Sequence, residues 1–163
     1  MKKTVYGFTL IEMILYVSLL TVLMTILTSL FISILDNQLK TSETSEVEQD
    51  GRFIIARFIY DISQAQNITL PATVGGTSST LQFAQSDINY TYSLSGVNLQ
   101  LSDGTYTDML NSYNTAISNL TFQRLGNASG KNTISVRFMV TSKIQSPGGG
   151  FEQKDFTITA GTR

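Results

Sequence analysis

Residues 7–35 read GFTLIEMILYVSLLTVLMTILTSLFISIL, and the interpretation of the whole chain depends on this stretch. The 28 residues from Phe8 to Leu35 contain one charged side chain, Glu12, close to their start. A membrane-spanning helix needs roughly 20 apolar residues, so the stretch is long enough to cross a bilayer. A carboxylate at membrane depth is costly, and a chain that keeps one there is expected to have a partner for it.

Two simple interpretations of this segment leave part of it unexplained. A secretory signal peptide has an apolar region of about 7–15 residues and then a small-residue cleavage site. Here the apolar run is too long, it contains Glu12, and no such site follows it. A plain single-pass anchor explains the hydrophobicity, but it explains neither Glu12 nor the Gly7–Phe8 junction behind Lys2 and Lys3.

The basic leader, the Gly7–Phe8 junction and Glu12 together resemble the type IV prepilin signal of type IV pilins and type II secretion pseudopilins. The resemblance implies that a membrane peptidase cuts between Gly7 and Phe8 and that Phe8 becomes an N-methylated amino terminus. It also implies that Glu12 is the filament-assembly residue. The implied partners are other pilin or pseudopilin subunits, the prepilin peptidase, an inner-membrane assembly platform and membrane lipid.

The physical chemistry of Glu12 agrees with an assembly role. Cleavage would give Phe8 an α-ammonium group, which is charged at neutral pH. Pairing of Glu12 with the Phe8 ammonium of a neighbouring subunit would offset the desolvation of both ions and favour one axial register. In an isolated subunit, the alternative is that Glu12 reaches up to the lipid headgroups.

The charges on either side of the apolar run predict its orientation. Lys2 and Lys3 precede it, whereas the polar and acidic segment 36–50 follows it with Lys40 as its single basic residue. The positive-inside rule therefore places the amino terminus in the cytoplasm and the remainder in the periplasm or outside the cell, later in a pilus or pseudopilus. Because segment 36–50 has no apolar face, we expect it to lie in water.

Hydroxyl side chains form a stripe along one side of the apolar helix. Small polar residues allow close helix approach in lipid, so the stripe is a candidate packing face for neighbouring subunits. The equally weighted alternative is that each hydroxyl bonds a carbonyl of its own helix. The residues are Ser18, Thr21, Thr25, Thr28, Ser29 and Ser33.

Apolar residues at steps of three and four between Phe53 and Ala65 predict an amphipathic helix that continues the membrane segment. A helix from Phe8 to about Asn67 would be about 90 Å long, unless Gly51 breaks it into two pieces. The expected organisation is a leader at 1–7, a transmembrane helix at 8–35, a helix continuation at 36–66 and an antiparallel β head at 67–163.

Beyond Gly76 the apolar pattern changes to period two, which indicates strands. We expect strands at 81–83, 88–94, 97–101, 117–125, 133–141 and 156–159, with a hairpin turn at Ser95-Gly96. The predicted fold class is α+β, with a long amino-terminal helix packed on an antiparallel sheet. This is also the architecture that the resemblance to pilins implies.

The composition argues against catalysis. The chain has no His and no Cys, so the usual proton shuttle, thiolate nucleophile and thiolate metal ligands are missing. We expect no enzyme activity, no cofactor and no metal site. Asp103-Gly104 with Asp108 is reminiscent of a calcium loop, but the spacing is wrong and Asp-Gly is a common turn signal.

The sequence therefore favours a structural subunit, a minor pilin or a pseudopilin similar to the J-type. The segment 57–65 resembles the corresponding helix of those proteins, although Arg57 and Asp61 also form an ordinary helix-stabilising i,i+4 pair. Twitching pili, secretion pseudopili and competence pili share this leader and scaffold. The alternatives are a tip adhesin, a DNA-uptake subunit, or a plain membrane-anchored β domain.

Nucleic acid would be a partner only of a DNA-uptake subunit. The formal net charge of −1 gives no reason to expect broad electrostatic binding to DNA. The candidate contacts form no dense patch with interleaved aromatic residues, so a solvated sheet surface is the default interpretation. They are Arg124, Lys131, Arg137 and Lys143.

Overall fold

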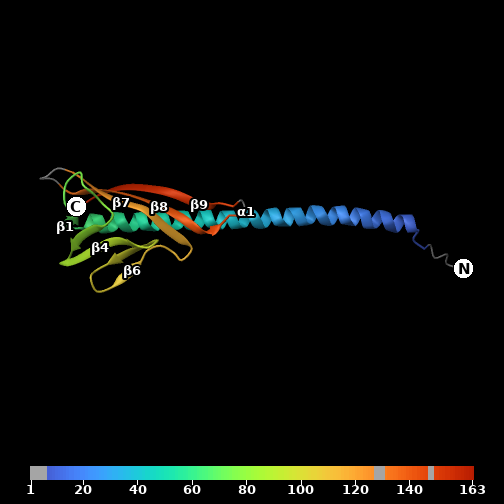
Figure 1. Ribbon diagram of the computed structural model, residues 1–163, viewed down its shortest axis with the longest axis horizontal. Helices are drawn as coiled ribbons and strands as arrows, with labels where there is room; N and C mark the ends of the chain where they lie inside the picture. The colour runs from blue at the N-terminus through green and yellow to red at the C-terminus, as the bar shows by residue number, and fades with distance from the viewer. Residues whose placement is uncertain (1–6, 127–130, 147–148) are drawn as a thin grey trace. The chain divides into compact units, whose positions relative to one another are not determined.

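The structure, a computed structural model, describes residues 7–126, 131–146 and 149–163 (Figure 1). One long helix, α1 (Leu10–Gln64), precedes a series of strands. The chain divides into two compact units, one up to Leu39 and the other from Lys40 onward. The strands are β1 (Asn67–Leu70), β2 (Thr77–Ser78), β3 (Leu81–Gln85), β4 (Ile88–Ser95), β5 (Asn98–Ser102), β6 (Thr107–Met109), β7 (Thr115–Leu125), β8 (Thr133–Gln145) and β9 (Phe151–Gly161).

The described part of the first unit is the beginning of α1 and the three residues before it. From Gly7 to Leu39 every side chain except that of Glu12 is exposed, so this stretch packs on nothing within its unit. By length and composition, α1 qualifies as a helix that can cross a membrane. An apolar helix with no protein around it is expected to find its environment in lipid or in other helices.

The second unit contains two antiparallel sheets. Sheet A has the order β1-β3-β4-β5-β6, and sheet B has the order β2-β7-β8-β9. The segment of α1 within this unit packs on both sheets, as Figure 1 shows. A long apolar helix on antiparallel β-structure confirms the predicted α+β, pilin-like fold class. The sequence predicted one sheet; there are two, because β6 does not pair with β7 and the described strands form two separate hydrogen-bonded sets. The short strand β2 belongs to sheet B, where it pairs with β7.

The core of the second unit is centred on Phe58 of α1. Its ring centroid lies 4.6 Å from that of Tyr92 on sheet A, and 5.6 Å and 5.9 Å from those of Phe122 and Phe138 on sheet B. All four side chains are fully buried. One helical residue thus contacts both sheets, which explains why the period-3.6 apolar face begins in this part of α1.

The expectation that residues 36–50 lie in water is wrong for part of that segment. Glu43 and Val47 are each 1% exposed. Distant loops contact the acids of this segment: Ser146 Oγ donates a hydrogen bond to one oxygen of Glu43, and the Ser112 N–H donates to the half-buried Asp50 at 2.8 Å.

Gly51 does not break the helix, because α1 is continuous through it. A Cβ atom at this position would lie 2.1 Å from Cζ of Phe156 on β9. The glycine therefore allows the strand to approach the helix closely, and it is not a hinge.

The six strands expected from the period-two pattern correspond to β3, β4, β5, β7, β8 and β9. The hairpin turn is shifted by one residue, because Ser95 pairs with Asn98 and Gly96-Val97 forms the loop. Val97 is consequently outside the strand and exposed. The short strands β1, β2 and β6 were not expected, because they are too short to show alternation.

Candidate functional site

The helix start is organised by Thr9. Its Oγ1 accepts a hydrogen bond from the Glu12 N–H at 3.3 Å, and its carbonyl oxygen accepts one from the Met13 N–H at 3.1 Å. Thr9 is therefore the N-cap of α1, and Glu12 is at the third helical position, the spacing of a capping box. A carboxylate in the first turn also interacts favourably with the helix dipole. The sequence-based prediction did not include this cap, although the Thr-x-x-Glu pattern of residues 9–12 signals one.

Phe8 lies just before the cap and is 70% exposed. Its ring meets the edge of the Tyr16 ring at a centroid distance of 6.1 Å. Gly7 is exposed, and a Cβ atom there would have no heavy atom within 4 Å. This fold therefore has no steric need for glycine at position 7. Lys2 and Lys3 lie outside the described residues.

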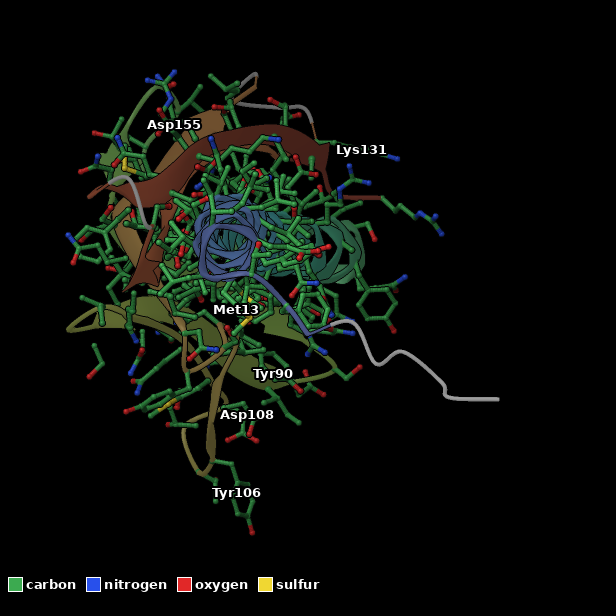
Figure 2. The ribbon with its side chains drawn as sticks, turned by 90° about the vertical axis from the view of Figure 1, so that its right-hand side faces the viewer. Met13, Tyr90, Tyr106, Asp108, Lys131 and Asp155 are labelled. Atoms are coloured by element: carbon green, nitrogen blue, oxygen red, sulfur yellow. The ribbon has the colours of Figure 1, made fainter. Side chains whose placement is uncertain are left out.

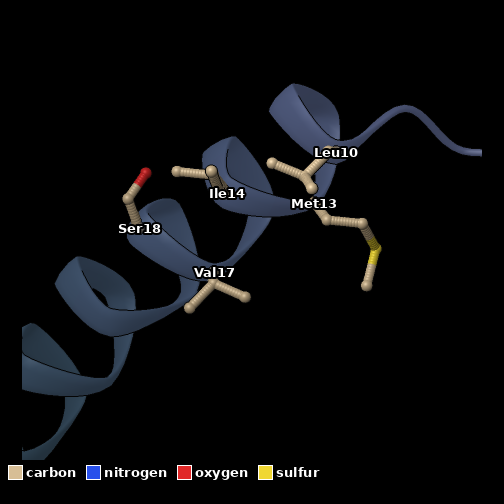
Figure 3. A pocket seen from close by; sticks show the side chains of 5 residues that line it. All are labelled: Leu10, Met13, Ile14, Val17 and Ser18. Carbon is tan, nitrogen blue, oxygen red and sulfur yellow. The ribbon is translucent and has the colours of Figure 1, made fainter.

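Glu12 is half-buried, in contrast to the exposed residues around it. An open apolar pocket, shown in Figure 3, lies on the same helical turns and is lined mostly by aliphatic side chains. The pocket lies on the side of the helix opposite Glu12, because at about 100° per residue its lining positions point away from position 12. Its lining residues are Leu10, Met13, Ile14, Val17 and Ser18.

The hydroxyl groups of the stripe bond carbonyl oxygens of their own helix, which is the second of the two arrangements considered from the sequence. Thr21 Oγ1 donates to the Val17 carbonyl at 2.8 Å, and Thr25 Oγ1 donates to the Thr21 carbonyl at 2.9 Å. The hydroxyls of Ser18, Thr28 and Ser29 likewise donate to carbonyls three or four residues earlier. These bonds satisfy the hydroxyl donors within α1, as expected for such residues in a helix.

A comparison with protein families bears directly on this segment. Residues 2–28 match the family described as the prokaryotic N-terminal methylation motif. The chain carries the pilin signature. This motif is the signature of type IV pilins and pseudopilins, and the match confirms the resemblance that the sequence showed over this segment.

The signature also bears on the kind of protein and on its location. Proteins with this motif are structural rather than catalytic and associate with other pilin subunits. An amino-terminal apolar helix together with the motif fits a protein anchored in the inner membrane. Searches of curated proteins and of solved structures found no match to this chain.

The Asp103-Gly104 segment is a turn. Asp103 Oδ1 accepts hydrogen bonds from the Thr105 and Tyr106 N–H groups at 2.8 Å and 2.6 Å. Both bonds lower the pKa of the Asp103 carboxyl group, and the bond from Tyr106 has the larger effect. Asp108 and Tyr106 lie on the β5–β6 hairpin, which projects away from the core in Figure 2. The carboxylate therefore closes its own loop, as an Asx turn does.

Two of the four cations considered for DNA contact are bound within the protein. Arg124 donates to the carbonyl oxygens of Ile68, Pro71 and Ala72 and to the side chain of Asn132. Lys143 Nζ donates to the Tyr113 carbonyl oxygen at 3.0 Å. Lys131, labelled in Figure 2, and Arg137 are exposed on the surface. Nothing in the described part of the chain favours a nucleic-acid interface.

The Arg57–Asp61 pair predicted from the sequence is present, with Arg57 Nε 2.8 Å from Asp61 Oδ2. Sequence reasoning missed its third member, because Tyr92 Oη donates to the same oxygen at 2.5 Å from sheet A. Burial, followed by the hydrogen bond to Asp61, raises the pKa of the Tyr92 phenol well above its usual value. The three side chains stabilise helix–sheet packing and are far in sequence from the amino-terminal motif.

Proposed function

We propose that this chain is a minor pilin or pseudopilin subunit that is cut between Gly7 and Phe8 and methylated at the Phe8 amino group. The observation that carries the proposal is the methylation motif at residues 2–28, directly on a helix whose exposed apolar start packs on nothing within its unit. The open surroundings of Gly7 support it further, because processing then explains a glycine that the fold does not require.

The proposed topology follows from the charges around the apolar run. Residues 1–7 are a cytoplasmic leader, and residues 8–35 cross the inner membrane. The helix continues through residues 36–66, and the β head, residues 67–163, lies in the periplasm or outside the cell. The prepilin peptidase and the assembly platform would then meet the chain at the membrane, where the first turns of α1 are exposed.

Glu12 has the assembly role in this proposal. Thr9 fixes the start of the helix, and the Glu12 side chain follows on its first turn. The Phe8 ammonium of a neighbouring subunit would neutralise the Glu12 carboxylate in a low-dielectric environment. The apolar pocket on the opposite face of the same helical turns would accept an apolar side chain of another subunit. Charge pairing would then fix the axial register of the helices.

Mass spectrometry of the protein purified from its native membrane tests processing. The expected terminus is N-methylated Phe8, and an intact Met1 terminus on functional protein would contradict the proposal. Gly7→Leu is expected to accumulate as uncut precursor with an unchanged unfolding midpoint, because position 7 is exposed and a Cβ atom there has no heavy atom within 4 Å. A Gly7→Leu protein that is cut normally would exclude this junction as the site.

Glu12 variants test assembly separately from processing. Glu12→Ala and the isosteric, neutral Glu12→Gln are expected to be cut normally but to be lost from sheared filaments. Glu12→Asp keeps the charge and should retain part of the incorporation. Equal incorporation of wild-type and Glu12→Gln protein would remove the charge-pairing role. For a minor subunit, quantitative mass spectrometry should find far fewer copies of this chain than of the main filament protein.

A further inference from the structure

Three acids lie on the buried face of α1 near the start of the second unit. Asp50 is satisfied, because the Ser112 N–H and the Thr115 hydroxyl both donate to its Oδ2. Glu43 is 1% exposed and accepts from Ser146 Oγ at 2.5 Å through Oε2. Glu46 accepts from Asn114 Nδ2 at 3.4 Å through Oε1.

The second oxygen of each glutamate is unsatisfied. Glu43 Oε1 and Glu46 Oε2 are both buried and have no hydrogen-bond partner. A buried carboxylate oxygen without a partner is costly to remove from water, and such a group calls for an explanation. The two residues are three apart on one helix, so they are neighbours, roughly 5–6 Å apart at Cβ.

No cation of the protein compensates these acids in the part of the chain that the structure describes. The contrast with Glu48, nearby on the same helix, is direct: Glu48 forms ion pairs with Lys154 and with Arg52, and these partners lower its pKa. Lys143 is next to Asn114 through a backbone hydrogen bond of 2.7 Å, yet its ammonium group donates to Tyr113. The exposed acid is therefore neutralised, and the buried pair is not.

We propose that Glu43 and Glu46 bind a divalent cation, with Ca²⁺ as the best fit. The available donors are all oxygen: the two carboxylates and the Ser146 hydroxyl. Asn114 directs its Nδ2 at Glu46, and a flip of its amide group would present its oxygen instead. Hard oxygen ligands of mixed type and flexible geometry suit Ca²⁺, whereas the absence of His and Cys from the chain disfavours transition metals. The described residues contain no group of three or more acids placed to hold a metal, so water would complete the shell.

The bound ion would join α1 to two segments of sheet B. Asn114 lies directly before β7, and Ser146 lies directly after β8. Extracellular Ca²⁺ modules bind with Kd values of about 0.1–1 mM, so under the proposed topology the site would fill after the head has crossed the membrane. Binding itself does not depend on that topology and is measured with purified protein.

The experiment uses the full chain in neutral detergent micelles, first stripped with EDTA and then titrated with CaCl₂ or MgCl₂. Saturating Ca²⁺, at about 100 times Kd, should raise the unfolding midpoint by about 10 °C. Mg²⁺ should raise it much less, because Mg²⁺ gives up its water reluctantly. Tb³⁺ luminescence excited through tyrosine gives a second readout, which Ca²⁺ should reverse by competition.

Glu43→Gln and Glu46→Gln should each abolish the Ca²⁺-dependent rise and the Tb³⁺ signal. Without metal, both variants should unfold at or above the wild-type midpoint, because each removes an uncompensated buried charge. The matched control is Glu48→Gln, which should keep the full Ca²⁺ response. No response of the wild type at about 10 mM Ca²⁺, or an equal response in Glu43→Gln, would overturn the site.

Discussion

Tyr92 Oη donates a hydrogen bond to Oδ2 of Asp61 across 2.5 Å and so links sheet A to α1 inside the core. Arg57 Nε donates to the same oxygen at 2.8 Å from the side that reaches solvent. Asp61 is 3% exposed, so its carboxylate depends on these two donors. A buried polar group that is fully bonded fixes one arrangement of helix and sheet, because any slip would leave it unpaired.

Tyr92→Phe should therefore destabilise the second unit by about 1–3 kcal/mol, since it removes one donor and leaves Asp61 partly unsatisfied. Urea unfolding of the full chain in micelles, followed by near-ultraviolet circular dichroism, measures this change. Tyr90→Phe is the matched control, because Tyr90 also stacks on Phe83 but its hydroxyl has no bond within the described residues. Equal losses in both variants would show that the Tyr92–Asp61 bond contributes nothing specific.

The stability should fall as the pH rises above about 10. The unfolded chain releases the phenol proton of Tyr92 near pH 10. The folded chain keeps this proton, because burial and then the bond to Asp61 raise the phenol pKa. The unfolded state then binds fewer protons than the folded state, so the free energy of unfolding decreases by up to about 1.4 kcal/mol per pH unit. Unfolding curves between pH 8 and pH 11 should show a steeper decline for the wild type than for Tyr92→Phe.

Gly51→Ala should be destabilising even though alanine favours helices. The new methyl group would occupy the position of the Phe156 ring, and overpacking of this kind costs about 1–3 kcal/mol. The gain in helix propensity offsets about 1 kcal/mol of that cost. Gly150→Ala is the control, because a Cβ atom there meets nothing within 4 Å. Adding Phe156→Leu to Gly51→Ala should recover part of the lost stability, because the smaller side chain makes room for the new methyl group. If the stability losses of the two single variants simply add in the double variant, the proposed contact between positions 51 and 156 would be contradicted.

Arg124→Gln should loosen the loop between β1 and β2. The Arg124 guanidinium holds the carbonyl oxygens of Pro71 and Ala72, at 3.2 Å and 3.0 Å, and loss of these bonds exposes the loop to protease. Limited proteolysis of the folded protein should give faster cleavage between residues 71 and 76. Arg137→Gln, on the neighbouring strand β8 and exposed, should be cut at the wild-type rate. Identical cleavage of both variants would argue against this role of Arg124.

The parts of the fold that repeat locally could be predicted from the sequence. Alternation at Leu81 and Phe83 located β3, and the apolar steps from Ile54 to Ile62 located the buried helical face. The amino-terminal motif identified Gly7, Phe8 and Glu12 as candidates because their spacing is itself the signal. In each case the pattern that allowed the prediction lies within a short stretch of sequence.

The remainder depends on contacts between residues far apart in the sequence. Glu43 looks solvated in isolation, but it is buried and accepts a hydrogen bond from Ser146, more than a hundred positions later. Strand β2 has only two residues, too few to show an alternation of apolar and polar side chains. It forms by pairing with β7 at the edge of sheet B. Glycine usually weakens a helix, so the sequence alone indicates a possible break at Gly51. Only the position of Phe156 shows that the glycine instead allows close packing of the strand on the helix.

The Thr9 cap has a consequence for maturation under the proposed cut. Both residues of the cap, Thr9 and Glu12, lie on the product side of the Gly7–Phe8 bond, so the peptidase would leave the first helical turn with its bonds in place. The subunit would then enter the growing fibre with its end already folded, with only a new positive charge added.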